Sequence, residues 1–381
     1  MKNNVLLKLT VIAALFVAAL ALTLSGCDGL RPVPSSPTSP AISPSTSSAT
    51  APQQTSLAKS DSRILAAIAV QEKHTKRLMS MADVVGTAVG LNDADEVVVK
   101  IYTAREGVGN LPATLDGMKI DVEVTGVFHA MGKPGGGGVS HTAKQTPPIS
   151  LGTSGGWGYD LANGYCCGGT LGSLVQKGGS QYVLSNYHVF QADIVSGGNN
   201  RVATTGDPII QPGLIDVSCN FANAQTVATL SGPASLPGSN VDAAIAQVVT
   251  GMVKTDGSIL EIGTISSTTV GAALKQAVKK SGRTTGLTRS SVTGLNATVS
   301  VAYDNECAGG AAFTKTFTGQ IVIGNKGSRF LNSGDSGSLM VEDVTTNPKA
   351  VGLLFAGSSK AAIANPIDEV LSYLGATMVG Q

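Results

Sequence analysis

Short runs rich in β-branched residues, separated by glycine-rich turns, fill residues 158–381 of this 381-residue chain. Glycine accounts for 47 residues, whereas aromatic residues make up only 4% of the chain. Val, Ile and Thr suit extended strands, and glycine suits tight turns better than helix interiors. Many short strands at such spacing are typical of β-sandwiches and β-barrels. The sequence therefore predicts a mainly β domain built from runs such as 182–185, 243–249, 298–301, 320–323 and 351–354.

The N-terminus has the pattern of an export signal. Lys2 and Lys8 precede an apolar stretch over 9–24, and a Leu-Ser-Gly-Cys sequence then ends at Cys27. A basic start, a short apolar core and small residues indicate a secretory signal, and small residues directly before a cysteine resemble a bacterial lipobox. We expect residues 1–26 to be a lipoprotein signal peptide and Cys27 to be lipidated, which would anchor the protein to a membrane surface in the bacterial cell envelope. An ordinary cleaved signal or an uncleaved anchor is the alternative.

Two segments of unusual composition enclose a more regular one. Residues 27–60 are rich in Ser, Pro and Thr, so we expect an extended tether. Residues 61–131 show a helical apolar pattern followed by alternating ones, which predicts a small α+β domain. Its expected elements are a helix over 62–81, a short helix over 111–115, and strands over 86–91, 96–102 and 119–131.

The role of this α+β domain is open at the sequence level, because no residue in it suggests chemistry. Our hypothesis is a propeptide or a domain that covers a cleft, and the alternative is a spacer or docking domain. Residues 132–157 contain runs of glycine and a Pro-Pro pair, so we expect a flexible linker in which His141 is solvated.

Four cysteines remain once Cys27 is set aside: Cys166, Cys167, Cys219 and Cys307. Export to an oxidising compartment makes two disulfides plausible. Adjacent cysteines are badly placed to bond each other, so each of the first two should pair with Cys219 or Cys307, in an order that the sequence leaves open. Buried free thiols are the alternative. We expect no metal site, because histidine is scarce and no Cys-x-x-Cys spacing occurs.

Charge excludes one class of partner. Lys and Arg total 26 and Asp and Glu total 25, so the formal net charge is +1. This balance offers no electrostatic footprint for nucleic acid, and we expect no nucleic-acid partner. Neither a phosphate-binding Gly-x-x-x-x-Gly-Lys-Ser/Thr nor a zinc-binding His-Glu-x-x-His occurs.

Three short patterns in the β region carry groups suited to nucleophilic catalysis. Ser336 lies in Gly-Asp-Ser-Gly-Ser, where the flanking glycines leave its hydroxyl and nearby backbone N–H groups accessible. His188 ends an apolar strand, and a neutral imidazole is a suitable base for a serine hydroxyl. Asp242 directly precedes another apolar strand, where an imidazole N–H would be a suitable donor to its carboxylate. Taken singly, the three also fit a plain turn, a structural histidine and a strand-capping aspartate.

The order His188, Asp242, Ser336 matches the chymotrypsin order and differs from the subtilisin and α/β-hydrolase orders. With Leu-Ser-Asn-Tyr-His-Val ending at Val189, the chain resembles the chymotrypsin/trypsin-like serine endopeptidases, in a bacterial branch. The resemblance implies a chymotrypsin-like double β-barrel over 158–381, with six strands in each barrel and the active site between them. It also implies a nucleophile at Ser336, a general base at His188 and an orienting carboxylate at Asp242. The oxyanion hole would be the backbone N–H groups of Gly334 and Ser336.

The implied activity is hydrolysis of protein or peptide substrates through an acyl-enzyme intermediate, with no cofactor. Phe330 stands where trypsin carries an acidic group, so we expect a shallow apolar or small-residue preference. A catalytically silent barrel that binds peptides or proteins is the alternative from another class, and an esterase would share the same chemistry.

Overall fold

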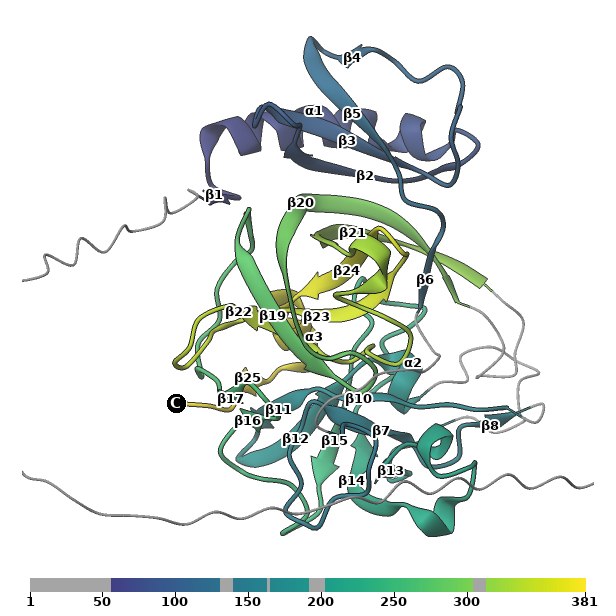
Figure 1. The fold of residues 1–381 in the computed structure, drawn as a ribbon, viewed down its shortest axis with the longest axis vertical. Helices are drawn as coiled ribbons and strands as arrows, with labels where there is room; N and C mark the ends of the chain where they lie inside the picture. Colours follow the sequence, from purple (N-terminus) through teal and green to yellow (C-terminus); the bar gives the residue numbers. More distant parts are fainter. Residues whose placement is uncertain (1–55, 131–139, 163–164, 192–202, 304–312) are drawn as a thin grey trace, which may run out of the picture. The chain divides into compact units, whose positions relative to one another are not determined.

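The computed structural model describes residues 56–130, 140–162, 165–191, 203–303 and 313–381. Strands dominate, and most of them belong to an eight-stranded and an eleven-stranded sheet (Figure 1). The mainly β fold class predicted from the sequence is confirmed. Within the described ranges, every helix is too short or too polar to cross a membrane.

The first sheet curls into a barrel around buried Trp157, Leu174 and Phe190. Its strand order is β10-β7-β13-β14-β15-β12-β11-β25. Strand β10 is at one end of this order, and β11 is next to the other end. Because only Gly172 separates β10 from β11 along the chain, the two ends of the sheet must lie together. The strands are β7 (Thr153–Trp157), β10 (Gly169–Leu171), β11 (Ser173–Lys177), β12 (Ser180–Ser185), β13 (Pro208–Gln211), β14 (Gln225–Ser231), β15 (Ala244–Val248) and β25 (Thr377–Met378).

The start of the first barrel corrects the predicted linker. Strand β7 lies inside the range 132–157, yet it is fully buried and pairs with β10 and β13. A Cβ on Gly155 would lie 2.4 Å from the Leu171 side chain, so glycine here permits close packing. His141 is 6% exposed and is not solvated. The linker prediction is wrong here because glycine occurs in tightly packed strands as well as in flexible turns.

The second barrel closes through six antiparallel strands. The order β19-β22-β23-β24-β21-β20 returns to its start because β19 also pairs with β20. Buried apolar side chains such as Leu331, Met340 and Leu354 fill its interior. The strands are β19 (Ala277–Gly282), β20 (Gly286–Tyr303), β21 (Phe313–Gly324), β22 (Leu339–Glu342), β23 (Ala350–Gly357) and β24 (Ala361–Pro366).

The N-terminal α+β unit extends this second sheet. Strand β2 (Val84–Leu91) pairs with β20, and β3 (Val97–Thr103), β5 (Met118–Val124) and β4 (Thr114–Leu115) follow it outward. Helix α1 (Ser62–Met79) begins at the N-cap Asp61, and its buried Gln71 donates to Thr87 at 3.0 Å. Helix α1 and strands β2 and β3 match the expected elements. The helix expected over 111–115 is wrong, because residues 114–115 form β4. The single strand expected over 119–131 is also wrong, because β5 ends at Val124 and a separate strand, β6 (Phe128–Ala130), follows it. β-Pairing with the long hairpin explains how so small a unit buries a core.

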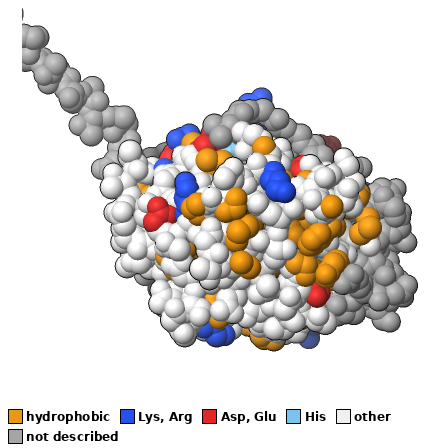
Figure 2. Space-filling view, turned by 90° about the horizontal axis from the view of Figure 1, so that it is seen from below, with side chains coloured by type: hydrophobic (Ala, Val, Ile, Leu, Met, Phe, Trp, Pro, Cys, Tyr) orange, Lys and Arg blue, Asp and Glu red, His pale blue; other side chains and the backbone are white. Residues whose placement is uncertain are grey.

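The remaining elements are short. They are β1 (Leu57–Ala58), β6 (Phe128–Ala130), β8 (Leu161–Ala162), β9 (Tyr165–Cys166), β16 (Ser258–Ile259), β17 (Gly263–Thr264), β18 (Ala273–Leu274), α2 (Tyr187–Phe190), α3 (Ile367–Leu374), and 3₁₀ turns at Leu214–Asp216, Phe221–Asn223 and Lys326–Ser328. On the face shown in Figure 2, Lys, Arg, Asp and Glu side chains are scattered, some of opposite charge next to each other, and hydrophobic side chains gather in separate groups. Neither positive nor negative side chains form a large patch on the described part of that face.

Candidate active site

His188 lies at the end of a buried strand of the first barrel. Strand β12 ends at Ser185, Asn186 caps the short helix α2, and His188 follows within that helix. The Asn186 side chain donates to the Asp242 backbone carbonyl at 2.7 Å, which ties this turn to the start of β15. The His188 side chain is therefore fixed between two adjacent strands and is 14% exposed.

His188 and Asp242 are in direct contact. The Nδ1 atom of His188 lies 2.6 Å from Asp242 Oδ2, and the His188 backbone N–H donates to Oδ1 at 3.3 Å. The Asp242 side chain is fully buried, and a buried carboxylate needs such donors. An ionised carboxylate only accepts, so Nδ1 carries the proton and Nε2 of the neutral ring is left as an acceptor. Nε2 is buried and has no hydrogen-bond partner among the described residues.

Tyr303, at the end of β20, is a third residue of this site and was not predicted from the sequence. Its hydroxyl donates to Asp242 Oδ2 at 2.8 Å, and its ring meets the His188 ring edge-on at 5.9 Å between centroids. Burial, together with the nearby Asp242 charge, raises the pKa of Tyr303 well above its usual value, so the hydroxyl remains a donor. No local pattern marks this tyrosine, since it comes from the second barrel.

Ser336 lies in a turn that only glycine-flanked sequences can form. Gly334 and Gly337 have φ values of +93° and +90°, in the left-handed region. The accessible hydroxyl expected from the flanking glycines is wrong for this conformation, because Ser336 is fully buried and its Oγ donates to the Phe355 carbonyl of β23 at a long 3.4 Å. A Cβ on Gly337 would lie 2.1 Å from Ser185 Oγ, so the turn presses directly against the end of β12. That contact brings the Ser336 turn to the same strand end that leads into His188.

Strand β10 also joins the Ser336 turn to the first barrel. The backbone N–H of Thr170 donates to the Ser336 carbonyl, and its hydroxyl donates to the Gly334 carbonyl, both at 2.9 Å. The Ser185 hydroxyl in turn donates to the Thr170 carbonyl at 2.7 Å. The structure thus brings His188 and Asp242 into contact, and it packs the turn that holds Gly334 and Ser336 against Ser185 and Thr170, near the strand end that leads into His188.

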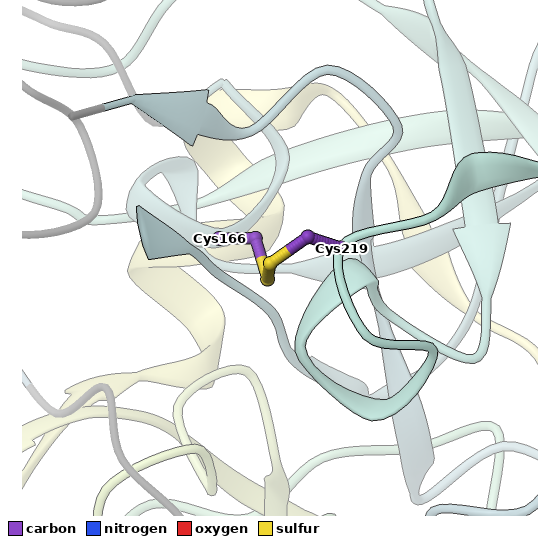
Figure 3. Close-up of a disulfide and its surroundings, with 2 residues drawn as sticks. All are labelled: Cys166 and Cys219. Atoms are coloured by element: carbon purple, nitrogen blue, oxygen red, sulfur yellow. A yellow bond between two sulfur atoms is a disulfide. The ribbon is translucent and has the colours of Figure 1, made fainter. Parts of the chain in front are cut away.

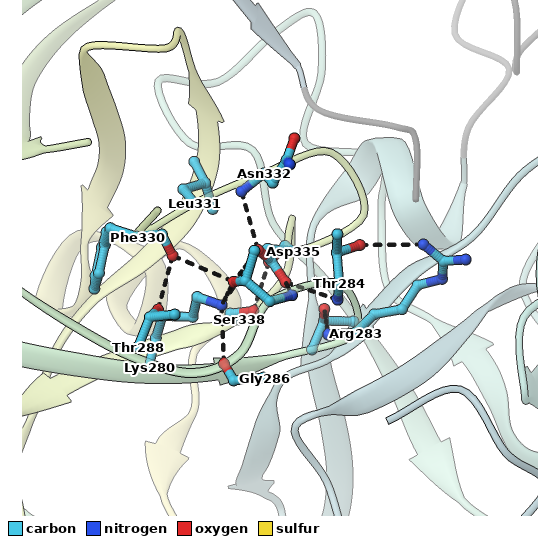
Figure 4. Close-up of polar contacts among 12 residues, drawn as sticks. Lys280, Arg283, Thr284, Gly286, Thr288, Phe330, Leu331, Asn332, Asp335 and Ser338 are labelled. Atoms are coloured by element: carbon cyan, nitrogen blue, oxygen red, sulfur yellow. Dashed lines mark hydrogen bonds and ion pairs between the residues drawn. The ribbon is translucent and has the colours of Figure 1, made fainter. Parts of the chain in front are cut away.

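A buried ion pair holds this turn from the other side (Figure 4). Lys280 and Asp335 are both fully buried, and Lys280 Nζ lies 3.2 Å from Asp335 Oδ2. Lys280 also contacts the Thr285 hydroxyl and donates to the Gly286 carbonyl at 3.0 Å. Burial lowers the pKa of Lys280, and the opposite charge of Asp335 counters that effect. Asp335, the residue before Ser336, is therefore held by this ion pair to the turn between β19 and β20.

The Asp335 carboxylate also accepts hydrogen bonds from four donors. They are the backbone N–H groups of Thr284, Thr285 and Asn332 and the Thr285 hydroxyl, at 2.6 to 3.1 Å. No local pattern marks Lys280 as the partner of Asp335, although a lysine is unusual in a strand of buried residues.

One predicted disulfide is present in the described residues. Cys166 is bonded to Cys219, with Cα atoms 5.5 Å apart (Figure 3), and this is one of the pairings that the sequence allowed. Cys167 is also disulfide-bonded. Cys307 and Cys27 lie outside the described residues. Among the described residues, no cluster of three or more His, Cys, Asp or Glu side chains is arranged to hold a metal ion.

The specificity argument from Phe330 is wrong. The Phe330 side chain is 2% exposed and packs in the core of the second barrel with Leu331 and Met340. Its carbonyl accepts from the Thr288 hydroxyl at 2.8 Å. Phe330 therefore faces the barrel interior, and its side chain supports no statement about a substrate side chain.

Comparison with known proteins gives partial matches. The family described as the Nal1 C-terminal domain matches residues 229–365, a stretch that includes Asp242 and Ser336 but not His188. No curated protein matches the chain. Among solved structures, a glutamic acid-specific serine protease described as using a histidine triad in substrate binding is 21% identical, with a TM-score of 0.39, covering 60% of this chain and 100% of its own. Thermobifida fusca protease A is 20% identical, with a TM-score of 0.40, covering 61% and 99%. Cellulomonas bogoriensis chymotrypsin is 20% identical, with a TM-score of 0.36, covering 61% and 99%.

Proposed function

We propose that this protein is a serine endopeptidase that hydrolyses peptide bonds of protein or peptide substrates through His188, Asp242 and Ser336. The single observation that supports this most strongly is the His188–Asp242 pair at 2.6 Å, which leaves His188 Nε2 buried and without a hydrogen-bond partner among the described residues. An imidazole in this tautomer is prepared to accept a proton from a serine hydroxyl.

In the proposed mechanism, His188 Nε2 removes the proton from Ser336 Oγ as that oxygen attacks the substrate carbonyl. The imidazolium that forms is stabilised by the Asp242 carboxylate, which is itself held by the Tyr303 hydroxyl at 2.8 Å. The backbone N–H groups of Gly334 and Ser336 donate to the oxyanion. His188 then protonates the leaving amine, and water hydrolyses the acyl-enzyme on Ser336.

The first test is covalent labelling by a fluorophosphonate, which reacts with an activated serine. Wild-type protein should be labelled, and Ser336→Ala should not. Ser333→Ala is a matched control, because it removes a serine hydroxyl from the same turn and should leave labelling intact. Labelling that survives Ser336→Ala would place the nucleophile elsewhere. Absence of labelling in the wild type would favour the silent, peptide-binding barrel.

We also propose that Cys27 is lipidated after removal of residues 1–26 and that the Ser/Pro/Thr-rich residues after it tether the enzyme to a membrane of the cell envelope. The tether is shorter than the predicted 27–60, because Leu57 and Ala58 form β1 and pair with β18. Support comes from the Leu-Ser-Gly-Cys sequence after an apolar stretch. Expression in bacteria fed an alkyne-bearing fatty acid should label wild type but not Cys27→Ser. Equal labelling of both would reject the lipid anchor.

A further inference from the structure

Strand β6 (Phe128–Ala130) lies between β20 and β23 of the second barrel, although both strands come much later in the sequence. It pairs antiparallel with β23, where His129 is opposite Gly357 and Ala130 is opposite Ala356. On its other side it pairs parallel with β20, where Phe128 is opposite Val301. The segment that leaves the α+β unit is thus built into the barrel as an added strand (Figure 1).

Strand β6 and the turn that holds Ser336 contact the same edge of β23. Strand β22 pairs with β23 as far as Leu353. The Ser336 turn follows along the same strand, since Gly337 N–H donates to the Leu354 carbonyl and Ser336 Oγ to the Phe355 carbonyl. Strand β6 comes next, at Ala356 and Gly357. Along β23 the order is therefore β22, the nucleophile turn, and β6.

An extended peptide binds to a protein most simply by adding a strand to an open sheet edge. A peptide reaching Ser336 along β23 would pair with Ala356 and Gly357, which are the residues that β6 pairs with. The two occupants therefore compete for the same backbone groups.

The side chains of β6 show what this edge accommodates. Phe128 is fully buried, packs in one cluster with Phe355 and Val299, and meets the Tyr102 ring edge-on at 6.0 Å between centroids. The His129 side chain is exposed, and Ala130 is half-buried. The site thus holds a strand with a large apolar side chain at one position and a small one two residues later, as alternation along a strand requires.

We infer that β6 occupies the substrate's place, so that the intact chain inhibits itself, and that the substrates are extended peptides with a large apolar residue two positions before a small one. This inference rests on the proposed peptidase function. Release of β6 from β23 opens the edge to external peptides, and the activity of the intact chain is set by how often that release occurs.

The test compares His129→Pro with His129→Ala in the full-length chain. Both remove the same exposed side chain, but proline also removes a backbone N–H donor from β6. Hydrolysis of fluorescein-labelled, unfolded casein should rise about tenfold in His129→Pro over wild type, which corresponds to weakening strand pairing by about one ladder hydrogen bond. His129→Ala should stay within about twofold of wild type. Ala130→Pro provides a second variant should the first fail to fold, and intact mass is checked before and after each assay.

Labelling by a small fluorophosphonate separates the two ideas. If the wild type and every variant resist labelling at Ser336, the proposed peptidase function fails. If labelling is normal while casein is cleaved at equal rates by wild type and folded proline variants, the peptidase survives and the self-inhibition by β6 is overturned. A gain in casein hydrolysis restricted to the proline variants supports the inference.

Discussion

A Lys280→Met substitution would leave the Asp335 carboxylate buried without its cation. Methionine keeps the length and apolar character of the lysine side chain, so the core of the second barrel stays filled. What is lost is the 3.2 Å contact from Lys280 Nζ to Asp335 Oδ2 and the bond to the Gly286 carbonyl at 3.0 Å. Both members of the ion pair are fully buried, so water cannot replace the missing charge.

The size of the effect follows from what remains around Asp335. Removing one member of a buried ion pair typically costs about 3–5 kcal/mol, because the other charge stays desolvated. Asp335 keeps the four donors that face it, which still stabilise its negative charge. We therefore expect a loss at the lower end of that range, about 3 kcal/mol in the free energy of unfolding.

The assay is urea unfolding at pH 7, followed by circular dichroism. Lys279→Met is the matched control, because Lys279 is the neighbouring strand residue but its Nζ donates to a carbonyl, that of Val344, at 2.7 Å. It should cost about 1 kcal/mol, the value of one ordinary hydrogen bond. In the double variant Lys280→Met/Asp335→Asn, the losses should be less than additive, since the second change removes the stranded charge. A loss below about 1 kcal/mol in Lys280→Met, equal to the control, would refute the reasoning.

Four further predictions address the candidate active site and the disulfide. Tyr303→Phe removes a hydrogen bond to the Asp242 carboxylate and should lower the peptidase kcat about tenfold, the effect of about 1.4 kcal/mol. Because burial raises the pKa of Tyr303, its contribution to stability is complete below about pH 10 and is lost as pH rises towards the folded-state value. Between pH 8 and pH 11, the free energy of unfolding measured in urea should therefore fall less in Tyr303→Phe than in wild type. Equal falls in the two proteins would contradict this. Cys219→Ala opens the bond to Cys166 across a sequence separation of 53 and should cost about 4 kcal/mol of stability, whereas an unchanged midpoint in calorimetry would count against it. His188→Ala should abolish peptide hydrolysis with an unchanged circular dichroism spectrum, and persistent turnover would remove His188 from the mechanism.

Local sequence patterns predicted much of the chain because they are read over a few residues. The short β-type run at residues 182–185 predicted β12, and helical spacing predicted α1 to within two residues at its end. The glycines that enclose Ser336 predicted a turn, and both have the positive φ that the turn requires. The contact between His188 and Asp242 also followed from the sequence, but only through the resemblance to a family whose residues occur in that order.

Other features could not be read from the sequence because they join residues far apart. Tyr303 reaches Asp242 across a separation of 61 residues, and Lys280 meets Asp335 across 55 positions of sequence (335 − 280). The glycines of β7 looked like a linker because sequence alone does not distinguish a flexible glycine from one pressed against Leu171. The place of β6 depends on which strand edge is left open after the barrel closes.

Sequence by itself therefore determined the local conformations, the export pattern and the candidate chemistry, since β-propensity, turn geometry and side-chain reactivity are properties of neighbouring residues. Tertiary structure alone decided which partners those groups meet: the tyrosine behind the aspartate, the lysine beneath the serine turn, and the strand that fills the open edge of β23. Those choices depend on barrel closure and on burial, which bring distant charges and open edges together and make every unpaired polar group costly.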